Sequence, residues 1–596
     1  MTKTATVRGL GALLLAGVAF APAVAIAQDV PAGALPSREE LEQGVTQGAL
    51  NSLNNTAVAP DDIQRAPCPL AAPEFADITF TLGSVTFTGM EGFPADLDLS
   101  PAWSGMVGQT MRVAAVCDIR DRAATILRGK GYLAAVQVPP QTIEDGNLRL
   151  DVLAARITRL QIKGDAGPNE EILLRYLTPL TEQPVFNSQE AERTLLLTRD
   201  LPGIDSRLVL RPVEGSPGEL IGEVAVRRVP FTADALVQNY NAKSTGPWSI
   251  LARTRFAGMT GWGDATTLSM VWSGDFEEQM VFQASHEFRI GSDGLRVAAD
   301  VTYAETDPTI GGANPFHSTT LAGTIREDYP IIRSRARNLF FGGGLDIVNQ
   351  DVEFGDITLT EDRLRVAWLR ADYAMIDMAS ANGRGGYNAL EPKFGLSAGV
   401  ELRQGLDILG ASTDCAKNFD LCAGPDGSFT SRVDGDPTAF VLRADASVSY
   451  RPTRAITLAF QPRAQWSPHA LLSYEELAGG NYTIGRGYDP GSAIGDSAVG
   501  FRSELRYGSA WPSIAGGRAV QPYAFFDAGW FWNEDTGLED TNPQKLYSVG
   551  GGIRANLMDR FRLDAALGVP LKDTLYDPDA KGDWRALVSL SMQLAQ

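Results

Sequence analysis

Histidine is scarce in this sequence, which has only three in 596 residues, and these lie far apart at His286, His317 and His469. Because imidazole and thiolate groups are the usual zinc ligands, this scarcity argues against a metal site. The chain also lacks the Gly-x-Ser-x-Gly motif of serine hydrolases, the His-Glu-x-x-His motif of zinc peptidases and a phosphate-binding loop before a lysine. We therefore expect no enzyme activity, no metal and no cofactor.

Basic residues are in the minority, with 52 lysines and arginines against 72 aspartates and glutamates and a formal net charge of −20. The charge becomes −22 (−20 minus 2) if an N-terminal segment that bears Lys3 and Arg8 is removed. Proteins that bind nucleic acid need a positive surface. We expect no nucleic-acid partner.

Long apolar runs are missing beyond the N-terminus, where no stretch approaches the ~18 apolar residues of a transmembrane helix. The N-terminus has a basic start with Lys3 and Arg8, an apolar run over residues 9–20 and an A-x-A pattern at residues 25–27. This order is typical of a secretory signal peptide. We predict that residues 1–27 are removed on export. An uncleaved membrane anchor is the alternative, which the short apolar run disfavours.

Cysteine is also rare, with four in the chain. Cys415 and Cys422 lie in a polar, glycine-bearing segment, where a disulfide would close a surface loop in an oxidising compartment. Cys68 lies in a proline-rich linker and Cys117 in a helical pattern, so a second disulfide could tie linker to domain. Metal binding is the alternative use of these cysteines, and the scattered histidines disfavour it.

Residues 28–76 are predicted to form a short helix followed by a polar, proline-bearing linker. Ser37 and Glu40 form a capping box, in which the Ser37 hydroxyl accepts from the Glu40 N–H and the Glu40 carboxylate reaches back. Apolar residues then recur at helical spacing, including Leu41 and Val45. The linker is long enough to let this helix lie away from the next domain, and an ordinary surface helix is the alternative.

Residues 77–155 and 156–230 are predicted to be two small α+β domains, because a similar order of strands and helices repeats after roughly 75 residues. Helices are expected at residues 113–128, 169–177 and 188–198, the first ending at glycine stop signals. Strands are expected at 77–82, 85–87, 134–138 and 148–153 in the first domain, and at 157–162, 207–211 and 220–229 in the second.

From Phe231 onward, segments alternate between apolar and polar residues with period two and are separated by Gly, Asp, Asn and Pro turns. The apolar faces end in Trp or Tyr, as at a bilayer interface, and the polar faces suit a water-filled lumen. We count sixteen such segments in residues 231–596 and predict a 16-stranded transmembrane β-barrel. It must close, because an open edge in lipid leaves backbone groups unpaired. The predicted fold class is mainly β, and a soluble β-solenoid is the alternative.

One segment interrupts the strand pattern, namely residues 471–499 between the predicted eleventh and twelfth strands. It contains Arg486 between Gly485 and Gly487, followed by Tyr488. Flanking glycines allow close backbone approach and a defined turn. We therefore expect a specific conformation here, and the alternative is an ordinary long surface loop.

Acidic residues on the neighbouring strands are expected to face this loop. Alternation places Phe525, Asp527 and Gly529 inward on the predicted thirteenth strand and Glu504 inward on the twelfth. We predict that the loop folds back into the barrel and that Arg486 pairs with Asp527. Loss of one partner of such a pair could cost ~3–5 kcal/mol, and less in a wetter lumen.

This order of features resembles the two-partner secretion (TpsB) transporters, relatives of the filamentous haemagglutinin and haemolysin transporters, over nearly the whole mature chain. The most specific shared motifs are residues 475–480 leading to 486–488, residues 525–529, residues 131–132 with 138–141 and 145–146, and residues 201–203. Two features depart from the family pattern. Gly485 stands where related barrels often have Val or Ile, and the chain ends in Leu594-Ala595-Gln596 without the usual aromatic.

The resemblance implies an outer-membrane protein that secretes a partner exoprotein, with two POTRA domains in the periplasm that receive it unfolded and a barrel surrounded by outer-membrane lipids. It also implies that Arg486 anchors the inward loop on Asp527 and that the helix at Ser37 plugs the resting pore. The chief alternative is a barrel-assembly factor of the same superfamily, which usually carries more POTRA domains. A passive porin or uptake receptor is less well supported, because a simple pore needs no tandem periplasmic domains.

Overall fold

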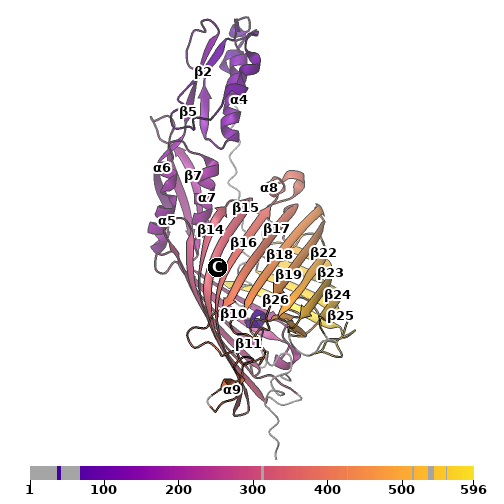
Figure 1. The fold of residues 1–596 in the computed structure, drawn as a ribbon. Coiled ribbons are helices and arrows are strands. Elements are labelled where there is room, and N and C mark those ends of the chain that lie inside the picture. The colour runs from indigo at the N-terminus through magenta and orange to yellow at the C-terminus, as the bar shows by residue number, and fades with distance from the viewer. Residues whose placement is uncertain are drawn as a thin grey trace, which may run out of the picture.

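The computed structural model describes residues 37–41, 68–274, 276–310, 315–425, 427–512, 514, 516–534, 542–558 and 560–595. The predicted signal peptide and Val45 lie outside these residues. Among the described residues, no helix is both long and apolar enough to cross a membrane. Two small α+β domains stand in line at one end of a large barrel (Figure 1). We call that end of the barrel the near end and the opposite one the far end.

The first small domain is a three-stranded sheet covered by one helix, α4 (Ala115–Gly129). The sheet order is β2 (Ser84–Thr88), β5 (Asn147–Ala154), β4 (Ala134–Gln137), with β2 parallel and β4 antiparallel to β5. The buried face of the helix is apolar, with a spacing of three or four residues, and consists of Val116, Ile119, Ala123 and Leu127. A disulfide between Cys68 and Cys117 ties the preceding chain to α4.

A separate two-stranded sheet flanks this domain. It pairs β1 (Thr79–Thr81) with β3 (Thr110–Arg112), and the sequence pattern predicted the first of these strands but not the second. Four 3-10 turns complete the region, η2 (Pro69–Ala71), η3 (Pro73–Phe75), η4 (Ser100–Ala102) and η5 (Ser104–Met106).

The second small domain repeats the strand arrangement of the first. Its order is β6 (Arg156–Gly164), β8 (Glu219–Arg228), β7 (Ile204–Pro212), again with one parallel and one antiparallel pair. The helical elements are η6 (Gly167–Asn169), α5 (Glu170–Leu177), α6 (Pro179–Glu182) and α7 (Ser188–Arg199). Helix α7 begins where it does because the Asn187 side chain accepts from the N–H of Gln189 at 2.9 Å.

In the described part of the chain, sixteen strands form a closed antiparallel barrel, which confirms the predicted architecture. The strands are β9 (Phe231–Gln238), β10 (Ser249–Ala257), β11 (Ala265–Ser273), β12 (Gln279–Ile290), β13 (Leu295–Thr306), β14 (Phe316–Arg333), β15 (Arg337–Phe354), β16 (Ile357–Ile376), β17 (Phe394–Gly405), β18 (Phe440–Thr453), β19 (Ile456–Trp466), β22 (Ser497–Tyr507), β23 (Arg518–Trp532), β24 (Gln544–Leu557), β25 (Phe561–Pro570) and β26 (Arg585–Ala595). The connections contain η7 (Lys243–Thr245), α8 (Met378–Ala381), η8 (Arg384–Gly386) and α9 (Phe419–Cys422). Pairing of β26 with β9 closes the barrel.

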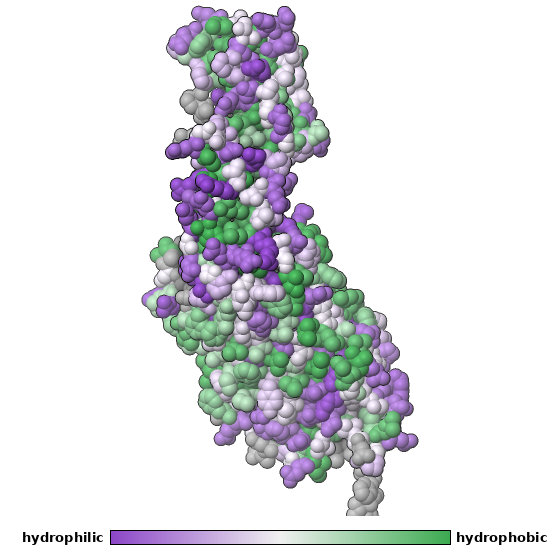
Figure 2. Space-filling model, turned by 90° about the vertical axis from the view of Figure 1, so that its left-hand side faces the viewer, coloured by the Kyte–Doolittle hydropathy of each residue, from purple (hydrophilic) through white to green (hydrophobic). Residues whose placement is uncertain are grey.

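The two faces of the barrel wall differ as the alternation predicts. Leu505 and Phe526 point outward and are 53% and 42% exposed, whereas their neighbours Glu504 and Asp527 point inward and are buried. Hydrophobic residues spread over the outer surface of the barrel, and hydrophilic residues are more frequent on the small domains (Figure 2). An apolar outside around a polar inside is the arrangement that lipid requires of a β-barrel.

Charged residues hold the second small domain against the near end of the barrel. Arg333 lies 2.7 Å from Asp200, and Arg335 lies 3.2 Å from Glu192 of α7. Arg193, also on α7, donates to the carbonyl oxygen of Pro330 at 2.8 Å. These contacts place the domain beside the β14–β15 turn.

A short helix, α2 (Arg38–Leu41), occupies the lumen (indigo in Figure 1). The capping box is present in both directions, because Ser37 N–H donates to Glu40 Oε2 at 2.8 Å and Glu40 N–H donates to Ser37 Oγ at 3.3 Å. Leu41 is 2% exposed and packs on apolar side chains of the barrel wall. The predicted continuation of this helix through Val45 lies outside the described residues.

Candidate functional site

The connection between β19 and β22, residues 467–496, folds into the lumen, and we call it the inward loop. Most of its residues are buried, and it contains a small hairpin of β20 (Leu477–Gly479) and β21 (Ala493–Gly495). The backbone of Gly485 and Gly487, on either side of Arg486, has φ values of 104° and 102°. A Cβ on Gly487 would also lie 3.0 Å from the carbonyl carbon of Gly568, so a larger residue would not fit this turn.

Arg486 is held at this turn by two acidic residues of the barrel wall. Its guanidinium lies 2.7 and 2.9 Å from the two carboxylate oxygens of Asp527 and 2.5 Å from Glu504. Its backbone N–H donates to Asp527 at 3.1 Å. The guanidinium carbon lies 3.9 Å from the ring centre of Phe525, which adds a cation–π contact. The structure therefore brings Arg486 together with Asp527, Glu504 and Phe525.

Gly529, the remaining predicted position on β23, makes room for the inward loop. A Cβ at this position would lie 3.1 Å from the Ile484 side chain and 2.9 Å from the ring of Phe531. A larger residue at this position would crowd the side chains of Ile484 and Phe531 and force one of them to shift.

Glu504 belongs to a wider charged network. It accepts from Arg506 at 2.6 Å and from Arg554 at 2.8 and 2.9 Å, and Arg554 also binds Asp564 at 2.8 Å. Arg506 and Arg554 were not among the predicted site residues, although alternation places both on the inward faces of β22 and β24. Several arginines thus balance the buried carboxylates on which the inward loop docks.

Tyr488 fastens the inward loop toward the far end of the barrel. It is fully buried, and its hydroxyl lies 2.7 Å from the carbonyl oxygen of Lys572 and 3.1 Å from that of Tyr547. The next residue, Asp489, pairs with Arg585 at the start of β26. Gly487 N–H donates to Asn481 Oδ1 at 2.9 Å, which closes the turn on itself.

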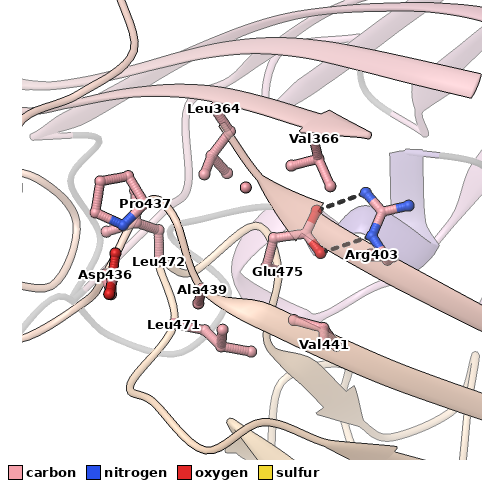
Figure 3. A pocket seen from close by; sticks show the side chains of 11 residues that line it. Leu364, Val366, Arg403, Asp436, Pro437, Ala439, Val441, Leu471, Leu472 and Glu475 are labelled. Carbon is pink, nitrogen blue, oxygen red and sulfur yellow. Dashed lines mark hydrogen bonds and ion pairs between the residues drawn. The ribbon is translucent and has the colours of Figure 1, made fainter. Parts of the chain in front are cut away.

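A second anchor lies in the first third of the inward loop. Arg403 of β17, 1% exposed, donates to both carboxylate oxygens of Glu475 at 2.7 and 2.9 Å (Figure 3). Arg403 also contacts Asp346 of β15 at 2.7 Å, and Arg443 of β18 donates to Glu475 at 3.1 Å. Beside this cluster is a mainly apolar pocket, lined by residues that include Leu364, Val366, Val441, Leu471 and Leu472.

A third anchor comes from the long connection between β17 and β18. Arg432 lies 2.9 Å from Glu476 and 2.7 Å from Asp496, the last residue of the inward loop. The same connection contains the disulfide between Cys415 and Cys422. In the sequence, residues 475–480 are recognisable only as a family motif. The partner of Glu476 could not be predicted, because a long irregular connection carries no periodic signal.

The chemistry of this site is electrostatic. Within the described ranges, no group of three or more His, Cys, Asp or Glu side chains is arranged to hold a metal ion. All four cysteines are in disulfides. The arrangement can hold a loop in a polar lumen and release it when the ion pairs break.

The chain is similar to known proteins over most of its length. The family model described as haemolysin secretion/activation protein ShlB/FhaC/HecB matches residues 223–555, and the ShlB-type POTRA domain model matches residues 80–154. The heme/hemopexin transporter protein HuxB of Haemophilus influenzae is 20% identical over 509 residues, which are 82% of this chain and 83% of HuxB. The outer membrane transporter CdiB of Dickeya dadantii is 21% identical over 547 residues, which are 88% of this chain and 87% of CdiB.

A solved structure shows the same fold. CdiB from Escherichia coli superposes with a TM-score of 0.68 at 18% sequence identity, covering 98% of this chain and 100% of that chain.

Proposed function

This chain belongs to the haemolysin secretion/activation family ShlB/FhaC/HecB, and from its geometry we propose how it moves its partner protein. It is an outer-membrane transporter of two-partner secretion, with its POTRA domains in the periplasm. The near end of the barrel therefore faces the periplasm, and the far end faces the cell surface. In the proposed mechanism the chain acts as a pore and needs no catalytic residue.

The observation that carries the proposal is the filled lumen. Helix α2 and the inward loop both lie inside the barrel, where the ion pairs of Arg486 and Glu475 hold the loop. A polypeptide can pass only after α2 leaves and the inward loop shifts. Ion pairs in a polar lumen suit such a movement, because water can replace each partner while the wall stays intact.

Reception of the partner is assigned to the POTRA domains. Strand β7 pairs with β8 on one side, and among the described residues no strand pairs with its other edge. An unfolded exoprotein can add to such an edge through backbone hydrogen bonds, without strict sequence demands. It then passes through the lumen in extended form, and its folding outside the cell makes transport directional.

The test is to delete this protein from its native host and compare the proteins in the culture medium with those of the parent strain. We expect one large exoprotein to disappear while the other outer-membrane barrels remain. An unchanged medium together with depleted barrels would instead favour the assembly-factor alternative.

Complementation of the deletion strain tests the role of the anchor. Arg486→Ala should restore the barrel but not secretion, because it removes the ion pair with Asp527. The control is Arg337→Ala, which changes an exposed arginine at the near end and should restore both. Normal secretion with Arg486→Ala would show that the loop anchor is not needed.

A further inference from the structure

The barrel lumen contains an apolar band at one level of the wall. Five inward-facing residues on five consecutive strands, β9 to β13, are direct cross-strand neighbours in the order Leu236, Leu251, Val271, Val281 and Ala304. None is more than 7% exposed. We call this row the apolar arc.

The arc is one residue deep, because the inward rows on both sides of it are polar. Toward the near end, the adjacent row is Asp234, Arg253, Ser269, Gln283 and Thr302. Toward the far end, the adjacent inward residues are Gln238, Ser249, Ser273, Gln279 and Thr306. Interiors of transmembrane barrels are normally polar, so an apolar row at a single level calls for an apolar occupant.

In this structure the occupant is a polypeptide. Leu41 of α2 packs in one cluster with the apolar arc. The cluster continues to Val348, Leu364 and Val366 farther along the wall and to Leu472 and Tyr474 of the inward loop. The Gln283 side-chain amide, from the adjacent polar row, donates to the carbonyl oxygen of Leu41 at 2.5 Å. The wall thus binds an apolar side chain through the arc and the main chain through an amide. These two contacts require only an apolar side chain and a main-chain carbonyl group, which any peptide with an apolar residue supplies.

The wall opposite the β12–β13 end of the apolar arc is charged. Strand β23 lies eight strands from β13 in the closed order of sixteen, so the two face each other across the lumen. The β22–β24 wall carries the charged network of Glu504, Arg506 and Arg554. An extended chain that alternates apolar and polar residues could present its apolar side to the apolar arc and its polar side to this network.

We infer that the apolar arc is a binding site for apolar side chains of the transported polypeptide, which take the place of Leu41 after α2 leaves. This inference rests on the proposed secretion function and adds a substrate class to it. The favoured segment is extended and has an apolar residue at every second position, as in the strands of a β-rich protein. Such a segment covers the arc when the plug is absent, so that the arc is not left exposed to water.

The test uses the full chain carrying Leu41→Asn, which weakens the seating of α2, in planar lipid bilayers, with two ten-residue peptides added on the POTRA side. This background serves as the parent for the comparisons below. One peptide alternates leucine with serine, and the other alternates asparagine with serine. The measured quantity is the duration of each current block. Burial of one leucine side chain predicts that the leucine peptide blocks about ten-fold longer than the asparagine peptide. The double variant Leu251→Ser with Val281→Ser should reduce this ratio to about one.

Two controls make the result specific. Leu251→Met keeps an apolar side chain in the arc, and Thr267→Ala changes an inward residue outside it, so both should keep the parental ratio. If the double variant does not assemble, Leu236→Ser alone should lower the ratio. Equal block durations for the two peptides in the parent, or an unchanged ratio in the serine variants, would overturn the inference.

Failure of this inference and failure of the proposed function can be told apart. The peptide measurement needs no native partner, whereas secretion by the parent chain in its host tests the function alone. Normal secretion with no leucine preference would reject the arc as a binding site and leave the secretion function intact.

Discussion

Replacement of Asp527 by asparagine keeps the size of the side chain and removes the charge that faces Arg486. In the structure, Asp527 is 0% exposed and accepts from Arg486 at 2.7, 2.9 and 3.1 Å. Removing one partner of a buried ion pair typically costs ~3–5 kcal/mol. Glu504 stays in contact with Arg486, and barrel lumens are wet, so we take the lower value of ~3 kcal/mol for the loss in docking free energy of the inward loop.

Cysteine reactivity can measure the release of the inward loop. Ser492 is 2% exposed in the docked loop, and all four native cysteines are in disulfides, so Ser492→Cys supplies the reactive thiol. If labelling by a maleimide requires release of the loop, a loss of ~3 kcal/mol predicts labelling about 100-fold faster in the Asp527→Asn background.

A matched substitution controls for the loss of any inward carboxylate. Asp445 on β18 pairs with Arg370 of the wall at 3.0 Å, so Asp445→Asn should leave the labelling rate unchanged. Heat-modifiable migration in gels would report that each variant forms a barrel. If Asp527→Asn labelled within about two-fold of the parent, a difference under ~0.5 kcal/mol, the pair would not anchor the loop.

Three further predictions concern helix α2, the pair of Arg403 and Glu475, and the contact between the second small domain and the barrel. Leu41→Asn removes the apolar side chain that seats α2, so the population with α2 displaced should rise about ten-fold. The vancomycin concentration that inhibits growth should then fall, while Leu41→Met should match the parent. Glu475→Gln leaves the buried Arg403 without its bidentate carboxylate and should lower the free energy of unfolding by ~2–3 kcal/mol. The measurement is the temperature at which heat-modifiable gel migration changes, which should fall. An unchanged temperature would exclude this anchor. Arg335→Glu breaks the ion pair with Glu192, in which the two side chains are 34% and 24% exposed, so the free energy of unfolding should change by under ~1 kcal/mol. The charge-swapped double variant Arg335→Glu with Glu192→Arg should restore the parental spin-label distance between the second domain and the barrel.

Local signals were enough to predict the barrel strands, the faces of those strands and the main helices of the two small domains. Period-two alternation predicted the barrel, because lipid on one side and water on the other demand different faces of the same strand. The same alternation placed Glu504 and Asp527 inward, since the face of a residue depends only on its position along its own strand. The capping box of Ser37 and Glu40 was also readable, because its partners are three residues apart.

Which inward residues meet was decided only by the tertiary structure. Arg403 and Glu475 are 72 positions apart, and no local pattern in either segment predicts that the two residues pair. The apolar arc likewise depends on the register of five strands, which turns and cross-strand pairs set together. By itself the sequence determined an exported barrel with a defined inward face and a loop built around Arg486. The structure decided the partners of that loop and the level of the arc, because contacts across a closed lumen follow from strand register and barrel closure and not from local periodicity.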